Sequence, residues 1–353
     1  MINTYGDNFK IRIFGESHAP EIGVEIEGLP KGETFDFDEL CEFLKRRAPG
    51  RTENSTGRRE PDIPVIRSGA KLSQKDSNDR VFYEYTGDTF LAVIENKDVK
   101  SDDYDSFRHI PRPGHADFPA MVRSGSDEIP LGGGPYSGRM TAPLCIAGGL
   151  ALQLLAKRGI GISAKAVRIG CETEPTAMNA AIEKAKAAGD SVGGVIACTV
   201  TGVPIGIGEP MFQGLENKIA QAVFGIPAVK GIEFGEGFNA AELRGSENND
   251  EYYFFGSDRS PESVGTKTNH AGGILGGMSF GMPIELRVAI KPTPSIAKLQ
   301  SSINLRTFEE EKLSVNGRHD PCIVPRAVPC VEAAVAIALY DLIAGTDKQT
   351  QIK

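Results

Sequence analysis

The chain has 353 residues, of which 40% are hydrophobic and 24% charged, and its formal net charge is −8. These values are typical of a globular protein, and the acidic balance excludes a surface built chiefly to bind the nucleic-acid backbone. The first residues lack the order of a secretory signal, and no stretch approaches the roughly 18 to 20 apolar residues of a membrane span. We expect a cytoplasmic protein that binds neither nucleic acid nor membrane.

Strands and helices alternate irregularly along the chain. Alternation of apolar and polar residues predicts strands, whereas a helical repeat predicts helices. The segments are, in chain order, strand 9–15, helix 37–47, strand 88–96, helix 144–157, helix 176–190, strand 193–204, strand 283–292 and helix 331–345. Because several strands follow one another without a helix between them, we expect an α+β fold with antiparallel sheets.

No linker divides the chain, so residues 1–345 are expected to form a single domain and residues 346–353 a flexible tail. Three long polar segments, 46–62, 109–138 and 244–269, have the character of functional loops. Six cysteines are scattered without a CxxC pair, and the histidines show no HxH or HxxxH pair with carboxylates at ligand spacing. We therefore expect reduced thiols and no metal site.

All five histidines lie in loop-like motifs, and two of them stand out. His18 ends a predicted strand in GESHA, where Glu16 and Ser17 are possible orienting partners. His115 follows the Pro-Gly turn of RPGHAD and lies near Arg112 and Asp117 in sequence. A neutral imidazole in such a place can act as a general acid or base near pH 7, although a surface histidine without a chemical role is the alternative.

Arginines form the second signal. One group lies close together in a single loop: Arg46, Arg47, Arg51, Arg58 and Arg59. For this group, a solvated basic patch is as good an interpretation as an anion-binding site. Others adjoin Gly or Pro: Arg112, Arg139, Arg318 and Arg326. A planar guanidinium offers two parallel donors to phosphate or carboxylate, so we expect a multiply charged anionic ligand.

Glycine-rich stretches form the third signal. LGGGPYSGRMTAP exposes backbone amides just before a predicted helix and suits an anion, although a plain loop is the alternative. HAGGILGGMSFG leads into the strand that ends at Lys291. The following KPTPS places Lys291, Thr293 and Ser295 on a kinked segment that could hold a nucleotide phosphate and ring.

Six motifs, GESHA, RPGHAD, GGGPYSGRMTA, NHAGGILGG, KPTPS and GRHDPCIVPRAVPCVEA, resemble those of the chorismate synthases, in the same order from residue 11 to about 343. The resemblance implies a lyase that converts 5-enolpyruvylshikimate 3-phosphate to chorismate and phosphate by 1,4-anti-elimination, the last step of the shikimate pathway. It also implies reduced FMN that is required but not consumed, a β-α-β sandwich of two related halves, and a homotetramer.

Roles for individual residues follow from the same resemblance. His18 would protonate the leaving phosphate, His115 would lie near flavin N1, and Asp320 would act through flavin N5 on the ring hydrogen. The residues that would bind the substrate are His18, Arg47, Arg112, Ser137, Arg139 and Arg318. Those that would bind FMN are Tyr136, Ser137, Ala228, Gly276, Lys291, Pro292, Thr293, Pro294, Ser295 and Arg318.

Three positions depart from the family pattern. Ala19 replaces the usual glycine after His18, and Pro135-Tyr136 stand where a basic residue and a serine are common. Glu53 lies in the arginine loop, which the resemblance links through Arg47 to NADPH as a reductant of the flavin. Two alternatives stay open at this stage: a flavin reductase that consumes NADPH, and a phosphometabolite-binding protein without catalysis.

Overall fold

The computed structural model describes residues 3–50, 60–97, 107–257, 259–315 and 319–352, with side chains described as far as Asp347. Its first sheet is antiparallel and has the strand order β1-β2-β3-β8-β5. The bounds are β1 Thr4–Tyr5, β2 Lys10–Gly15, β3 Glu21–Glu27, β5 Val65–Ser68 and β8 Phe90–Glu95. A smaller sheet lies beside it, with the order β4-β7-β6: β4 Thr34–Asp36, β6 Ala70–Lys75 and β7 Val81–Tyr85.

The second large sheet is also antiparallel and has the order β11-β16-β10-β9. Its strands are β9 Gly161–Ile169, β10 Gly194–Thr201, β11 Val229–Phe234 and β16 Ile284–Ile290. Alternate residues of β10, Ile196, Cys198 and Val200, are buried on one face. This period of two is what a strand with a single face on the core requires.

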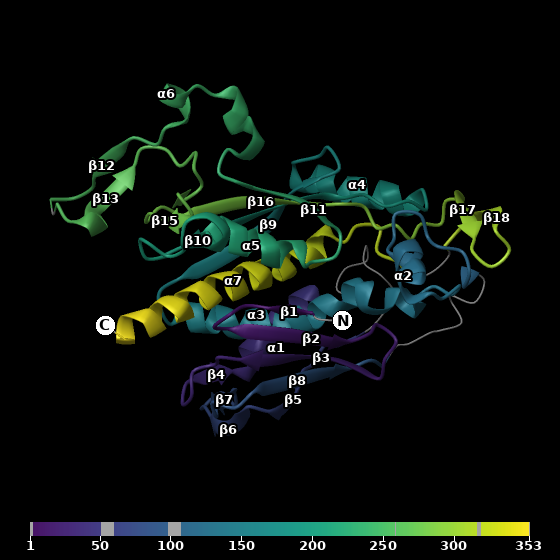
Figure 1. The fold of residues 1–353 in the computed structure, drawn as a ribbon, viewed down its shortest axis with the longest axis horizontal. Helices are drawn as coiled ribbons and strands as arrows, with labels where there is room; N and C mark the ends of the chain where they lie inside the picture. The colour runs from purple at the N-terminus through teal and green to yellow at the C-terminus, as the bar shows by residue number, and fades with distance from the viewer. Residues whose placement is uncertain (1–2, 51–59, 98–106, 258, 316–318, 353) are drawn as a thin grey trace.

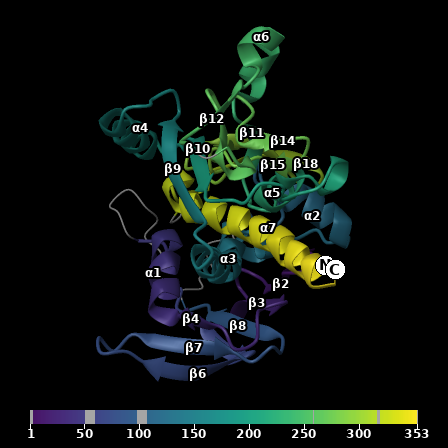
Figure 2. The ribbon, with the colours of Figure 1, turned by 90° about the vertical axis from the view of Figure 1, so that its left-hand side faces the viewer.

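Four helices fill the space between the two large sheets (Figures 1 and 2). They are α1 Phe37–Arg47, α3 Thr141–Ala156, α5 Leu215–Phe224 and α7 Val324–Ile352. The first half of the chain supplies one sheet with α1 and α3, and the second half supplies the other sheet with α5 and α7. The result is a β-α-β sandwich with one continuous apolar core, and α4 Pro175–Ala187 lies outside it, beyond the second sheet.

Short elements complete the described chain. Between α6 and β13, an arm projects from the second sheet and is plain at the upper left of Figure 1. The short elements are α2 Asp117–Ser124, α6 Gly245–Asn248, β12 Tyr252–Phe254, β13 Val264–Thr266, β14 Ile274–Leu275, β15 Met278–Ser279, β17 Gln300–Asn304, β18 Glu309–Leu313 and 3-10 turns at Leu131–Tyr136, Gly138–Met140, Met211–Gln213, Gly237–Glu242 and Pro261–Ser263.

The α+β fold and all eight predicted elements are confirmed. Two predicted segments differ at their ends. The polar segment expected from residue 46 begins later, because Arg46 and Arg47 form the last turn of α1. The last helix is longer than predicted: α7 runs from Val324 to Ile352, so the segment predicted as a tail is helical. Ala19 does not have a positive φ. Its backbone conformation is therefore open to alanine and does not require the glycine that is usual at this position.

Two helical stretches, Gly138–Ala156 and Val324–Asp347, are long and apolar enough to span a membrane by length and composition alone. Their apolar windows are 89% and 83% buried inside the fold. The expectation that no stretch approaches the length and apolar composition of a membrane span was therefore wrong. A helix that is covered on all sides inside the fold needs apolar residues around its whole circumference.

Candidate active site

A cavity of about 590 Å³ opens where α3 and α7 begin. Its volume lies in the range of about 300 to 1,000 Å³ that is usual for small-molecule sites. The N-termini of two helices carry partial positive charge, which favours an anion there. The polar and glycine residues of its wall are His18, Arg47, Arg112, Gly114, His115, Gly132, Tyr136, Ser137, Gly138, Arg139, Thr141, Gly225, Lys291, Thr293, Ser295, His319, Asp320, Arg326 and Cys330.

One side of the cavity is organised by Asp117, which begins α2 and is fully buried. Its carboxylate accepts hydrogen bonds from Arg112 Nε at 2.7 Å and Nη2 at 2.9 Å, and lies 2.6 Å from His115 Nδ1. Burial alone would raise the pKa of Asp117, but the hydrogen bonds from Arg112 and His115 outweigh it and hold this pKa well below its usual value. Asp117 therefore stays ionised and fixes both cavity-lining groups.

The glycine run between residues 132 and 134 packs directly against both histidines. All three glycines have positive φ, at 59°, 84° and 50°. A Cβ on Gly132 would overlap the His18 ring, and one on Gly133 would lie 3.0 Å from His115 Cε1. His18 is further held by Ser17, whose Oγ lies 2.9 Å from His18 Nδ1. Only glycine permits this close approach, so a single turn brings two imidazoles, distant in sequence, to one cavity.

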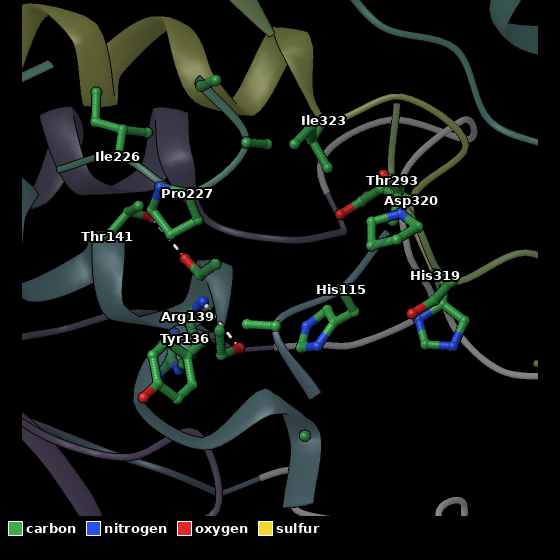
Figure 3. A pocket seen from close by; sticks show the side chains of 18 of the residues that line it. His115, Tyr136, Arg139, Thr141, Ile226, Pro227, Thr293, His319, Asp320 and Ile323 are labelled. Carbon is green, nitrogen blue, oxygen red and sulfur yellow. Dashed lines mark hydrogen bonds between the residues drawn. The ribbon is translucent and has the colours of Figure 1, made fainter. Parts of the chain in front are cut away.

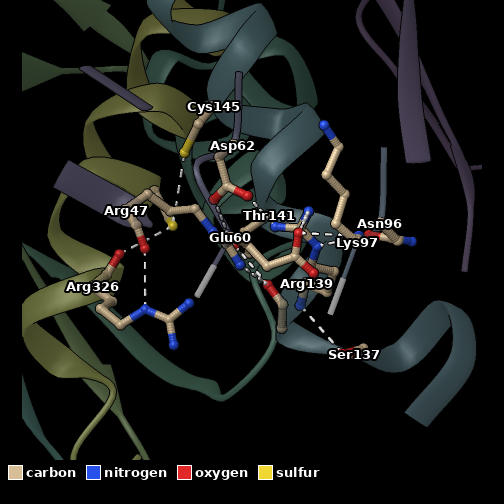
Figure 4. A network of polar contacts seen from close by, with 12 residues as sticks. Arg47, Glu60, Asp62, Asn96, Lys97, Ser137, Arg139, Thr141, Cys145 and Arg326 are labelled. Atoms are coloured by element: carbon tan, nitrogen blue, oxygen red, sulfur yellow. Dashed lines mark hydrogen bonds and ion pairs between the residues drawn. The ribbon is translucent and has the colours of Figure 1, made fainter. Parts of the chain in front are cut away.

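The opposite side of the cavity is organised by a second buried carboxylate, Asp62 (Figure 4). Arg47 donates to one of its oxygens at 2.6 Å, and Arg139 donates to the other. Arg47 also binds Thr141 Oγ1 at 3.1 Å, and Arg139 binds Asn96 Oδ1 at 3.0 Å. Burial opposes ionisation of Asp62, but the two guanidinium groups lower its pKa. Two guanidinium groups therefore share one buried carboxylate, and Glu60, 3.5 Å from Arg139, is a second buried carboxylate on this side.

Asp320 forms the third part of the wall, just before α7. It is 8% exposed and forms an ion pair with Arg326, which also donates through Nε to the backbone oxygen of Arg47 at 3.0 Å. Figure 3 shows Asp320, Thr293 and His319 on one side of the cavity, with Tyr136 and Arg139 across from them. A carboxylate fixed in this way can accept or return a proton inside the cavity.

The segment from Lys291 to Ser295 lies along the same wall. Lys291 donates from Nζ to the backbone oxygen of Gly114, and its pKa is lowered by burial and by Lys230 nearby. Thr293 Oγ1 is buried without a hydrogen-bond partner. A buried hydroxyl left unsatisfied at a cavity wall is the kind of group that a bound ligand completes.

Ala228 lines the cavity next to Lys291 and has φ of 75°, a left-handed conformation that is unfavourable for alanine. Its backbone oxygen accepts from Lys291 N at 2.9 Å. The strained turn and the unsatisfied Thr293 hydroxyl both border the same space. The residues present therefore fit a ligand with polar oxygens along this segment.

Some predicted residues lie elsewhere. Gly276 lies in the turn between β14 and β15 and is not among the cavity-lining residues, nor is Pro292. Arg318 lies outside the described residues, as do Arg51, Glu53, Arg58 and Arg59. Arg46 forms an ion pair with Glu332, Oε2 to Nη1 at 2.7 Å, away from the cavity wall.

Two further histidines also serve local structure. His109 Nδ1 lies 2.8 Å from the backbone oxygen of Asp127, and His270 Nδ1 lies 3.1 Å from the backbone oxygen of Asn248. Among the described residues, no group of three or more His, Cys, Asp or Glu side chains is placed to hold a metal ion.

The carboxylates Asp62 and Glu60 were not predicted as site residues, and His319 was one of the five loop histidines without an assigned role. Arg326, one of the arginines expected to suit an anionic ligand, does line the cavity. Asp62 lies 15 positions after Arg47 but 77 before Arg139. Nothing in an RREPDIP segment marks its aspartate as the shared partner of two arginines. The positive φ of 51° at Asp62 is visible only in the structure.

The cavity combines two helix N-termini, several guanidinium groups and two imidazoles. This arrangement is typical of an enzyme that acts on a small anionic substrate. The comparisons identify which family it belongs to. The family model for chorismate synthase matches residues 9–344. The chain belongs to the chorismate synthase family, whose named activity forms chorismate at the last step of the shikimate pathway.

Individual relatives agree with this assignment. The chain is 45% identical to the chorismate synthase of Lancefieldella parvula and 43% identical to that of Chitinophaga pinensis, and each match covers 97% of this chain and 96% of the relative. It is 41% identical to that of Thermococcus kodakarensis, over 95% of this chain and 96% of the relative. A crystal structure of chorismate synthase superposes with a TM-score of 0.70 at 22% identity, covering 97% and 93% of the two chains, and supports the fold.

Proposed function

We propose that this chain converts 5-enolpyruvylshikimate 3-phosphate to chorismate and inorganic phosphate by 1,4-anti-elimination, as an FMN-dependent lyase. The observation that carries the proposal is the glycine turn at residues 132–134, which places His18 and His115 on one basic cavity. The reaction breaks one ring C–H bond and one C–O bond to phosphate, and it forms a new C=C bond. It needs groups that bind anions and groups that move protons.

The arginines and helix N-termini bind the anionic groups of the substrate. Arg112 and Arg139 line the cavity and are 5% exposed each, so their charge is poorly screened by water. Asp117 and Asp62 hold the two guanidinium planes in place before the substrate arrives. Pre-ordered donors bind phosphate and carboxylate without first losing side-chain entropy.

The two histidines have different roles, and Asp320 acts beside them. His18, oriented by Ser17, donates a proton to the leaving phosphate, which makes it a better leaving group. Asp117 accepts from Nδ1 of His115, so the proton of a neutral ring belongs on Nδ1, and Nε2, which lies 3.4 Å from Arg112 Nη2, is the acceptor atom of the ring. Asp320, held by Arg326, accepts the proton that leaves the ring carbon.

The segment 291–295, Ala228 and Tyr136 with Ser137 would hold reduced FMN, and the unsatisfied Thr293 hydroxyl supports a ligand there. When bound, reduced FMN would supply electron density that lowers the cost of expelling phosphate, because the hydrogen that leaves from a different ring carbon is not acidified by a carbonyl. The side chain of Ser295 accepts from Arg112 Nη1 at 3.2 Å. This hydrogen bond links the proposed cofactor segment to the proposed substrate arginine.

We further propose NADPH as the reductant of the flavin, and a cytoplasmic homotetramer as the working form. The guanidinium of Arg47 is 3% exposed and bound to Asp62 and Thr141, so any NADPH contact there would require those bonds to be exchanged. Large exposed apolar side chains, such as Phe212, Phe238 and Phe308, support self-association. Sedimentation velocity measures the oligomeric state directly.

The decisive experiment is an anaerobic assay with chemically reduced FMN and 5-enolpyruvylshikimate 3-phosphate, in which phosphate and chorismate are followed together. We expect both products in equal amounts with no net loss of reduced flavin. Stoichiometric NADPH consumption without phosphate release would instead identify a flavin reductase. Tight substrate binding without any product would identify a phosphometabolite-binding protein.

The double substitution His18→Ala with His115→Ala should abolish chorismate formation, because both proton-transfer groups are lost. FMN binding and the thermal midpoint should change little. The matched control is His109→Ala with His270→Ala, two histidines outside the cavity wall, which should retain activity. Turnover like that of the unsubstituted enzyme in the first double variant would contradict the proposal.

A further inference from the structure

The contact between α3 and α7 contains a pair of cysteines that the proposed reaction does not use. Cys145 on α3 and Cys330 on α7 are 0% and 2% exposed, and their sulfur atoms lie 3.9 Å apart. One turn further along both helices, a Cβ on Gly148 would overlap the Cβ of Ala333. The two helices are therefore in close contact at this point, and the two thiols face each other.

The two sulfur atoms have different surroundings. Cys330 lines the cavity, whereas Cys145 does not. The thiol of Cys330 donates to the backbone oxygen of Arg326 at 3.4 Å, and the Cys145 thiol donates to Cys330 Sγ. The hydrogen bond from Cys145, together with the charges of Arg47 and Arg326, lowers the pKa of Cys330 despite its burial. Burial raises the pKa of Cys145.

We propose that Cys330 and Cys145 form a redox-sensitive pair, in which hydrogen peroxide that enters the cavity oxidises Cys330 and Cys145 then closes a disulfide between α3 and α7. The lining position of Cys330 gives a small oxidant access that a core cysteine lacks. The arginines beside it stabilise the thiolate, which is the reactive form. The facing thiol is the resolving group.

Each step balances. The Cys330 thiolate attacks one peroxide oxygen, so that an S–O bond forms, the O–O bond breaks, and the departing hydroxide becomes water on taking a proton from solvent. Cys330 sulfur is oxidised by two electrons and peroxide is reduced. The Cys145 sulfur then attacks the Cys330 sulfur, an S–S bond replaces the S–O bond, and the thiol proton of Cys145 leaves with the hydroxide as a second water.

The disulfide would alter the cavity wall. The sulfur atoms must approach from 3.9 Å to about 2.05 Å, which moves Cys330 relative to the Arg326 oxygen. Arg326 binds both Asp320 and the backbone oxygen of Arg47, so the displacement reaches two cavity-lining groups. We expect oxidation to lower turnover, and dithiothreitol to restore it.

Peptide mapping by mass spectrometry tests the pair without reference to the reaction. Native protein is treated with hydrogen peroxide, free thiols are blocked after denaturation, and peptides are analysed without reduction. We expect a Cys145–Cys330 disulfide that forms at least about tenfold faster than any oxidation of Cys198, a buried cysteine of β10 that is 1% exposed and whose pKa burial raises to about 12. Exposed Cys171 reports the reactivity of an ordinary surface thiol.

The variant Cys145→Ser separates the two steps. Because no resolving thiol remains, the sulfenic acid on Cys330 should accumulate and react with dimedone, and the crosslinked peptide should disappear. Recovery of Cys330 as a free thiol under conditions that oxidise Cys171 would overturn the proposal. Oxidation of Cys198 as fast as Cys330 would overturn it as well, because it would indicate unfolding rather than a built site.

Discussion

Each of the two sides of the cavity has a buried aspartate that holds two cavity-lining side chains, but the side chains differ between the two sides. On one side, the buried Asp62 binds two arginines, Arg47 and Arg139, whose charge is permanent. On the other side, the buried Asp117 binds one arginine and one histidine, Arg112 and His115, and the histidine can be neutral. The first arrangement is a fixed electrostatic frame. The second combines anion binding with a group that can exchange protons.

Because of this difference, removing the charge of Asp62 and removing the charge of Asp117 should affect the enzyme in different ways. Loss of the Asp62 charge leaves two buried cations, for which Glu60, 3.5 Å from Arg139, is the remaining carboxylate among the described residues of this side. Loss of the Asp117 charge leaves one cation and a ring whose proton position is no longer fixed. Stability should respond most at Asp62, and proton transfer most at Asp117.

The largest effect is expected for Asp62→Asn. Asparagine keeps the size of the side chain and tolerates the positive φ at this position, so the change isolates the charge. Removing one partner from a buried ion pair costs about 3 to 5 kcal/mol, and the free energy of unfolding from urea titration should fall by that amount. The control Asp190→Asn removes the exposed partner of Lys298 and should cost below about 1 kcal/mol. Equal losses in the two variants would show that Asp62 is not a structural frame.

An intermediate effect is expected for Asp117→Asn. Without the carboxylate, the Nδ1 proton of His115 is no longer fixed and Arg112 loses its main partner, so kcat should fall by about 10²-fold. The pH profile of kcat should also shift, which a purely structural loss would not produce. Asp127→Asn is the matched control, because its carboxylate lies 3.7 Å from His109, a histidine that does not line the cavity. An unchanged pH profile in Asp117→Asn would refute the positioning role.

The smallest effect is the pH dependence of stability. The folded-state pKa of Asp117 lies below its unfolded value, so its ion pairs contribute stability above about pH 4 and lose it as the pH falls toward the folded pKa. The difference in unfolding free energy between the unsubstituted enzyme and Asp117→Asn should be constant from about pH 7 to about pH 5, and should shrink below about pH 4. A difference that grows in acid would contradict the direction of the shift.

The local sequence determined much of this protein. Alternation in residues 9–15 and 283–292 predicted β2 and β16, and the helical repeat at 37–47 matched α1 residue for residue. The glycine run and the histidine motifs indicated an anion site with acid-base groups. These signals are local, because the period of two or 3.6 residues, a turn or a motif can be read from neighbouring positions.

The shared partners were decided only by the tertiary structure. Arg139 meets Asp62 from 77 positions away, and Cys145 meets Cys330 from 185 positions away. Nor did local pattern show that two apolar helices of membrane-spanning length lie between sheets rather than in a bilayer. Sequence fixes which side chains are available, but pairing of buried charges depends on which elements pack together. That packing brings arginines and histidines that are distant in sequence to one cavity, where Asp62 holds the side chains of one side and Asp117 those of the other.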